Sequence, residues 1–283
     1  MREDSPSRTA LAVAIQRAAH QMLDHPPLFA DPYAARILGA RVRTELDEKR
    51  ERLARSRFSP VLRAALASRA RVAEDGLADA VARGVRQYVI LGAGLDTFAL
   101  RNPHPSLCVF EVDHPRTQEW KRRLLAEEKL APANVTFVSV NFEKQDLLTE
   151  LRSAGLNLQE PTFFSWLGVV MYLEMAAIEA TLRDVATLAG REGGVVFDFF
   201  RRPERSQIML RFVFWLRRHH VARLGEPFRT LLEPDDTRAL LGKVGFAHVD
   251  ILTPQQINAR YFMNRGDALR VSPLNYIATA TVG

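Results

Sequence analysis

Short apolar runs that alternate with helix-length segments dominate the chain after Gly84, and they restrict its possible folds most strongly. Seven such runs occur, at 87–91, 107–112, 135–140, 162–166, 195–199, 249–252 and 276–282. The first five are separated by segments long enough to form helices. Continuous apolar strands that alternate with helices are typical of a mostly parallel sheet covered on both faces. We therefore expect an α/β fold.

The residues before Gly84 have helical periodicity, so we expect a single domain over 1–283 with two parts. A helical N-terminal cap is expected over 1–83 and a Rossmann-like core over 84–283. An apolar, arginine-rich segment at 201–225 interrupts the alternation after the fifth strand and is expected to form a helical lid insertion. Spacing of apolar residues and flanking turn residues predict helices at 9–22, 36–53, 60–82 and 235–244.

Composition excludes several classes of protein. The 283 residues are 47% hydrophobic and 25% charged, as in ordinary globular proteins. No segment offers the roughly 20 apolar residues of a membrane span, and the N-terminus does not resemble a secretory leader, so a cytoplasmic location is expected. The net charge of +6 is not clustered, because acids interleave with bases in the densest run at 41–57, and no nucleic-acid partner is expected. Since Cys108 is the only cysteine, neither an intramolecular disulfide nor a bound metal is expected.

The first and second predicted strands end in residues suited to a nucleotide-like cofactor. Gly92-Ala93-Gly94 predicts a sharp turn that a ligand can approach closely, and a helix expected from about Leu95 would present free backbone N–H groups. Asp113 ends the second strand, where a carboxylate can accept from both ribose hydroxyls. The alternatives are a plain tight turn for the glycines and, for Asp113, an N-cap of the helix that opens after it.

The glycine spacing distinguishes between two cofactors. A dinucleotide fingerprint needs a third glycine three residues after the second, and this chain has Thr97 there. S-adenosyl-L-methionine has no pyrophosphate, so a glycine turn, a ribose carboxylate and an adenine slot suffice for it. We favour this cofactor and keep a nicotinamide-dependent oxidoreductase as the alternative.

Four motifs in order resemble the leucine carboxyl methyltransferase family, in its bacterial branch of class I S-adenosylmethionine-dependent methyltransferases. They are RAAHQMLDHPPLFADPYA (17–34), GAGLDT (92–97), FEVDHP (110–115) and SWLGVVMYL (165–173). The resemblance covers nearly the whole chain. It implies a seven-stranded sheet with six parallel strands and an antiparallel last one, a helical N-terminal cap, and S-adenosyl-L-methionine as cofactor.

The resemblance also implies the positions that hold the cofactor, which are Arg69, Gly92, Ala93, Gly94, Asp113, His114, Asn141, Phe142 and Leu167. Arg69, with Arg71 as the fallback, is expected to pair with the cofactor carboxylate. Asn141 stands where the family has an aspartate, and its amide oxygen can still accept from adenine. Leu167 stands where many members have a glutamate that contacts the cofactor. This substitution implies a rebuilt pocket wall, weaker cofactor binding, or compensation by a main-chain carbonyl. It also leaves open the alternative of a degenerate protein that binds the cofactor without catalysing methyl transfer.

The acceptor is expected to be a carboxyl or hydroxyl group on a small apolar metabolite or a peptide C-terminus. Methyl transfer is an in-line displacement, so positioning contributes much of the catalysis. A carboxylate needs no base, whereas a hydroxyl benefits from one. The candidate catalytic residues are Tyr172, His219, Tyr261 and Arg265. In the alternative interpretations, Tyr172 is a tyrosine packed at a helix start, His219 forms a surface pair of histidines with His220, and Arg265 contributes only surface charge.

The apolar segment of the insertion, at 206–224, has three possible interpretations. It is a cap over an apolar acceptor pocket, a packing or dimer helix, or a membrane-surface helix. The resemblance favours a mobile cap, with an apolar face formed by Ile208, Phe212, Trp215 and Leu216. An oligomer is possible.

Overall fold

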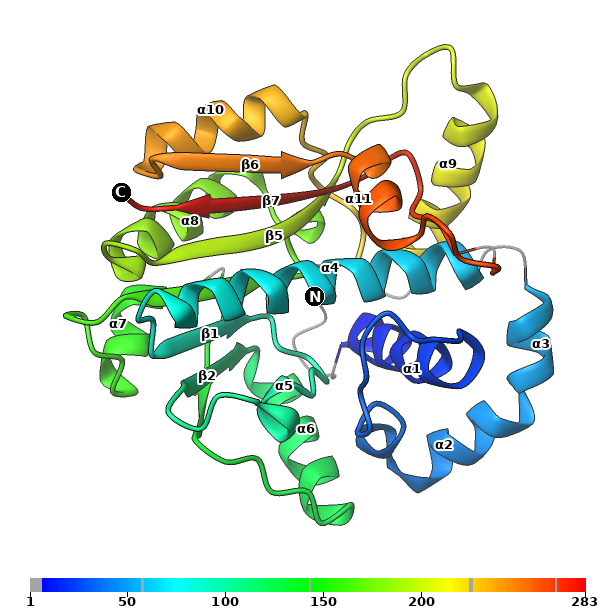
Figure 1. The fold of residues 1–283 in the computed structure, drawn as a ribbon, viewed down its shortest axis with the longest axis horizontal. Helices are drawn as coiled ribbons and strands as arrows, with labels where there is room; N and C mark the ends of the chain where they lie inside the picture. Colours follow the sequence, from blue (N-terminus) through cyan, green and yellow to red (C-terminus); the bar gives the residue numbers. More distant parts are fainter. Residues whose placement is uncertain (1–6, 57–58, 143, 224–225, 268) are drawn as a thin grey trace.

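The computed structural model contains one seven-stranded sheet in the order β3-β2-β1-β4-β5-β7-β6 (Figure 1). It describes residues 7–56, 59–142, 144–223, 226–267 and 269–283. The strands are β1 (Gln87–Leu91), β2 (Cys108–Asp113), β3 (Val135–Ser139), β4 (Thr162–Trp166), β5 (Gly194–Phe200), β6 (His248–Leu252) and β7 (Asn275–Thr281). All seven predicted strands are present, which confirms the predicted α/β class.

Only β7 runs antiparallel to its neighbours, β5 and β6, whereas β1 to β5 pair in parallel. This confirms the expectation of six parallel strands and an antiparallel last one. The chain order reverses between β1 and β4, and ligands of open α/β sheets bind in the crevice at this reversal, outside the carboxyl ends of the strands. The glycine turn after β1 and the motif after β4 both lie there.

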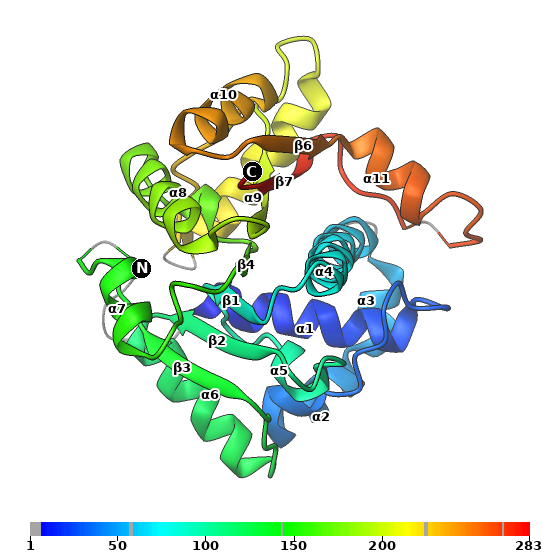
Figure 2. The same ribbon diagram turned by 60° about the vertical axis from the view of Figure 1, so that its left-hand side comes forward.

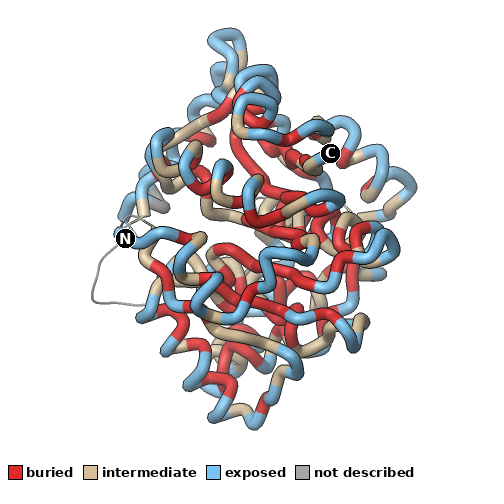
Figure 3. Tube along the Cα trace, turned by 90° about the vertical axis from the view of Figure 1, so that its left-hand side faces the viewer, coloured by how far each residue is buried: buried red, intermediate tan, exposed pale blue. Residues whose placement is uncertain are grey.

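Helices cover both faces of the sheet because alternate strand residues point to opposite sides. Val89 and Leu91 of β1 join a buried cluster with one set of helices, and Tyr88 and Ile90 join a cluster with the other set. The first set contains α7 (Leu147–Ser153), α8 (Met175–Ala189) and α10 (Pro234–Val244). The second contains α4 (Ser59–Ala82), α5 (Phe98–Arg101) and α11 (Pro254–Tyr261). Burial is accordingly concentrated along the strands and the inner helix faces (Figure 3).

The N-terminal residues form a helical cap beside the β1–β2 side of the core (Figure 2). The cap has its own buried cluster, in which Ala14 and Ala18 meet Ile37, Leu95 of the glycine-turn segment and Leu124. Its elements are α1 (Arg8–Leu23), the 3-10 helix η1 (Arg36–Leu38), α2 (Gly39–Glu48) and α3 (Arg50–Arg55), next to α6 (Pro115–Glu127). A second 3-10 helix, η2 (Val170–Tyr172), follows β4.

Two helix predictions were wrong in their bounds. The helix expected from Leu95 begins at Phe98, because the Asp96 side chain accepts the Phe98 N–H at 2.7 Å and holds the preceding residues in a turn. The helix expected over 36–53 is three shorter helices. Gly39, where η1 passes into α2, has a φ of +76°, and the chain leaves helical geometry again at Lys49.

The insertion after β5 contains one long helix, α9 (Ile208–Arg223), which lies at the edge of the molecule (Figure 1). Its inner side packs through Phe214 and Leu210 against Phe200 and Phe228. Within the predicted insertion, residues 224 and 225 and the side chains of residues 217, 220 and 221 lie outside the described residues.

Candidate active site

The glycine turn after β1 forms the floor of the site and requires glycine at two positions. Gly92 and Gly94 have φ values of +67° and +49°, which L side chains rarely adopt. A Cβ atom at Gly92 would also overlap a methyl carbon of Val169. The turn therefore presents bare backbone at the carboxyl edge of the sheet.

Asp113, the last residue of β2, fastens this turn to the neighbouring strand. Its two carboxylate oxygens accept the N–H groups of Gly94 at 2.5 Å and His114 at 2.6 Å. A carboxylate has about four lone-pair positions, so two acceptor positions remain for ribose hydroxyls. Burial raises the pKa of Asp113 to about 6, although the two backbone hydrogen bonds oppose the shift. The N-cap alternative for Asp113 is wrong, because His114 caps α6 and accepts from Arg116 N–H.

The turn after β3 forms the next wall of the site. Val140 N–H donates to the Asp113 carbonyl at 2.9 Å, which brings the segment after β3 beside the end of β2. Asn141 and Phe142 then line the cavity, and Phe142 also packs against the buried core. This places an amide and an aromatic ring next to the carboxylate of Asp113.

A buried ion pair forms the opposite end of the site. Arg69 of α4 donates to Asp198 of β5 at 3.1 Å, and the other Asp198 oxygen accepts the Gly168 N–H at 2.6 Å. Strand register pairs Trp166 with Phe197, so Asp198 sits beside Leu167. Asp198 thus places a carboxylate next to Leu167, the position where many family members have a glutamate. Arg69 lines the cavity, whereas the fallback Arg71 is exposed and pairs with Asp75.

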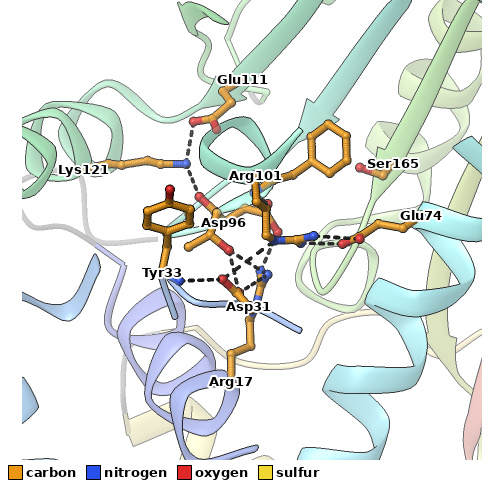
Figure 4. Close-up of polar contacts among 12 residues, drawn as sticks. Arg17, Asp31, Tyr33, Glu74, Asp96, Arg101, Glu111, Lys121 and Ser165 are labelled. Carbon is orange, nitrogen blue, oxygen red and sulfur yellow. Dashed lines mark hydrogen bonds and ion pairs between the residues drawn. The ribbon is translucent and has the colours of Figure 1, made fainter. Parts of the chain in front are cut away.

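A buried charge network attaches the N-terminal cap to the glycine turn (Figure 4). Arg17 of α1 donates to Asp96 at 2.5 Å and to Asp31 at 3.0 Å, and Asp31 also accepts from Thr97 at 2.6 Å. Burial would raise the pKa of Asp96, but the nearby cations, led by Arg17, outweigh it and hold that pKa far below its ordinary value. The carboxylate is therefore ionised, and its charge holds α1 against the turn.

One cavity of about 260 Å³ unites these features. All nine predicted cofactor positions line it, together with Tyr172. Among the other lining residues, which the sequence did not predict, are Ser7, Thr9, Ala10, Val13, Ala14 and Arg17 from the cap, Glu74 from α4, and Tyr88, Asp96 and Ser165 from the core. The signals for the buried network were an arginine on the apolar side of the predicted helix at 9–22 and the presence of Asp31, Asp96 and Thr97 in the motifs at 17–34 and 92–97.

Tyr172 stands at the mouth of the cavity beside the segment that follows α9. Its ring lies 5.4 Å from that of Phe228, and Glu226, Pro227 and Arg229 of that segment also line the cavity. Arg229 forms an exposed pair with Glu174 at 3.2 Å. The mouth thus combines aromatic surface with a cation whose partner is easily exchanged, since exposed pairs contribute only about 0–1 kcal/mol.

Three predicted catalytic residues lie away from this cavity. Tyr261 donates to Asp75 at 3.1 Å, and Arg265 binds Asp267 and the carbonyl of Pro26. His219 is exposed on α9, where its ring lies 4.1 Å from Trp215. None of the three is among the lining residues, so we assign them no part in the reaction below.

The predicted apolar face of the insertion also does not reach the cavity. Ile208, Phe212, Trp215 and Leu216 are 46–77% exposed, and no described residue of α9 lines the pocket. These side chains therefore do not line the cavity, and Phe214 occupies the inward face of α9 instead.

Comparison with solved structures identifies the fold. Over 96% of this chain and 97% of the other, the fold matches a DUF574 family protein from Streptomyces avermitilis, with a TM-score of 0.59 and 15% identity. An S-adenosylmethionine-dependent methyltransferase, SibL, in its apo form, matches 97% of this chain and 70% of its own, with a TM-score of 0.50 and 16% identity. The fold is that of a class I S-adenosylmethionine-dependent methyltransferase.

Sequence comparison then defines the family. The family model for leucine carboxyl methyltransferase matches residues 10–186. YktD of Bacillus subtilis, whose name describes it as an S-adenosyl-L-methionine-dependent methyltransferase, is 31% identical over 95% of both chains. A relative from Mycobacterium avium with a name of the same kind is 34% identical over 69% of this chain and 66% of its own. This chain belongs to the leucine carboxyl methyltransferase family, and its cofactor is S-adenosyl-L-methionine.

Proposed function

We propose that the protein transfers a methyl group to an oxygen atom, and that this atom belongs to a carboxylate. The observation that carries the proposal is the side-chain chemistry of the cavity. Among the described residues that line it, the one imidazole is His114, which caps α6 near the ribose carboxylate. The carboxylates of Glu74 and Glu226 also line the cavity. A hydroxyl acceptor would need such a group placed as a base near the methyl group, whereas a carboxylate acceptor is already ionised at neutral pH and needs none.

The residues divide into a cofactor end and an acceptor end. Asp113 would accept from the ribose, Asn141 from the adenine amino group, and Arg69 would pair with the methionine carboxylate. S-adenosyl-L-methionine supplies a methyl group bonded to a positively charged sulfur. The acceptor oxygen forms a bond to this carbon as the carbon–sulfur bond breaks, its electron pair stays on sulfur, and no proton moves.

At the mouth, Arg229 would exchange its exposed pairing with Glu174 for the acceptor carboxylate, and Tyr172 would orient the acceptor. The family membership argues against the nicotinamide-dependent alternative, which would need a different cofactor. An observed methylated product would exclude a degenerate protein that binds the cofactor without turnover.

The test is turnover of a panel of amphipathic carboxylic acids with matched alcohols, using cofactor labelled in its methyl group. A methyl ester releases methanol in mild alkali and a methyl ether does not, so labelled methanol identifies the carboxyl product. Arg229→Gln should raise KM for the acid by about tenfold. Arg183→Gln, at another exposed pair on α8, is the matched control. Alkali-stable products from alcohols alone would contradict the proposal.

A further inference from the structure

The outer face of α9 carries most of the large apolar side chains that are exposed in the described part of the chain. Eight large apolar side chains are exposed in the described part of the chain. Five of them belong to this helix: Ile208, Met209, Phe212, Trp215 and Leu216, at 46–77% exposure. Large apolar groups gathered on one exposed face mark an interaction site. We call these five residues the α9 stripe.

The stripe points away from the protein. Residues three and four apart share one face of a helix, so Ile208, Phe212 and Leu216 form a row with Trp215 beside it. The opposite face carries Phe214, which is buried against Phe200 and Phe228. The helix is therefore already packed on its inner side, and a second, outer apolar face is left without a partner among the described residues.

The charge around the stripe identifies the kind of partner. Between Glu204 and Glu226 the sequence contains five arginines and no acid. Four of these arginines are exposed, Arg205, Arg211, Arg218 and Arg223. A cationic helix with an exposed stripe of Phe, Trp, Leu, Ile and Met has the composition of helices that lie in the plane of an anionic membrane surface.

A second copy of the chain would fit this face poorly. A symmetric contact through α9 would bring the arginines of both copies together without an acidic residue of either helix between them. Crossing the membrane is also not implied, since none of the helices in the described ranges is long and apolar enough to span it. We propose that α9 binds the protein to the surface of a membrane rich in anionic lipids.

This position would set the active site beside the lipid. The segment that follows α9 contributes Glu226, Pro227 and Arg229 to the cavity mouth. Phe228 of the same segment contacts both Phe214 of α9, with ring centres 6.0 Å apart, and Tyr172. An amphipathic acceptor held in the bilayer would then be close to the mouth.

The experiment is co-sedimentation with vesicles, without cofactor or acceptor, so the result does not depend on the proposed methyl transfer. One set contains phosphatidylcholine with phosphatidylglycerol, and the other phosphatidylcholine alone. We expect binding to the anionic vesicles that weakens as salt is added. Phe212→Ser should weaken it by about tenfold or more, and Arg211→Gln by about fivefold.

Matched controls come from the opposite end of the sheet. Leu158→Ser removes another exposed apolar side chain, and Arg152→Gln another exposed arginine; both should bind as the wild type does. Trp215 emission should shift to the blue with anionic vesicles, and Trp215→Phe should lose this shift while it keeps most of its binding. Unchanged melting temperatures would show that the variants are folded.

Three results would overturn the proposal. The first is no binding to the anionic vesicles, or binding that the α9 and control variants weaken equally. The second is a lipid-free dimer that Phe212→Ser abolishes, which would assign the stripe to a second copy. The third is strong protection of α9 from hydrogen exchange by cofactor and acceptor without vesicles, which would show that α9 is a lid over the active site.

Discussion

Asp113 combines a raised pKa with two hydrogen bonds from the backbone, which makes cofactor binding sensitive to pH. Burial raises its pKa to about 6. Ribose hydroxyls donate more strongly to the ionised carboxylate, so bound cofactor favours that form and affinity falls as the pH drops through about 6. We expect Kd for S-adenosyl-L-methionine, measured by calorimetry, to rise up to about tenfold between about pH 7 and about pH 5.

Asp113→Asn is the matching variant, because it keeps the shape of the side chain and cannot ionise. It should bind the cofactor more weakly at neutral pH by about tenfold or more, because charge-assisted hydrogen bonds are lost and because an amide has one acceptor oxygen for the N–H groups of Gly94 and His114. Its Kd should then be nearly constant over the same pH range. A wild-type Kd that does not change across this range would refute the ribose assignment.

Asp198 acts through Arg69 and the Gly168 N–H, so we expect it to position the residues around the methionine part of the cofactor. Asp198→Asn should weaken S-adenosylhomocysteine binding by about tenfold, since an amide has one acceptor oxygen for the two donors. Binding of 5′-methylthioadenosine, which lacks the carboxylate and the ammonium group, should not change. Equal weakening of both ligands would indicate a general structural defect instead.

The attachment of α1 to the core depends on one buried arginine, Arg17. The Arg17 side chain is 9% exposed, and its partners Asp31 and Asp96 are 0% and 21% exposed. Arg17→Met would leave these two carboxylates without their main cation, and breaking a buried pair costs about 3–5 kcal/mol. We expect a loss of this size in the free energy of unfolding in urea, together with weaker cofactor binding.

Arg41→Met is the control for this change. Arg41 pairs with Glu45 in the same cap, but its side chain is 91% exposed, and such substitutions change stability by less than about 0.5 kcal/mol. If the two variants had the same denaturation midpoint, the buried network would not be what holds the cap.

The elements that the sequence predicted well are those whose signal is local. The run at 162–166 is β4 with the same bounds, because an apolar strand buried on both faces differs plainly from its flanks. The Arg17–Asp96 contact could not be predicted, because it joins residues 79 positions apart. Periodicity also predicted a stripe on α9 without showing which face of the helix the core would cover.

The cavity lies between the N-terminal cap, formed by α1 to α3, and the core, and ligand binding should bring these two units into closer association. The cap supplies six of its lining residues, from Ser7 to Arg17, and the rest come from α4, the strand ends of the core and the segment after α9. Of the sites predicted from sequence, the cofactor positions and Tyr172 share this cavity, because family motifs mark strand ends. The other predicted catalytic residues, His219, Tyr261 and Arg265, do not, since His219 lies on α9 and Tyr261 and Arg265 connect the α11 region to α4 and the N-terminal cap.

Hydrogen exchange measured by mass spectrometry tests this arrangement on the intact protein. Binding of S-adenosylhomocysteine should slow exchange in α1 and in the turn at 92–97, because both would contact the ligand and local opening would then require its release. Exchange in α9 and in β6 should stay the same, since neither contributes a described residue to the cavity. Slower exchange in α9 comparable to that in α1 would show that the insertion closes over the cofactor, and unchanged exchange in α1 would show that the cap is not part of the site.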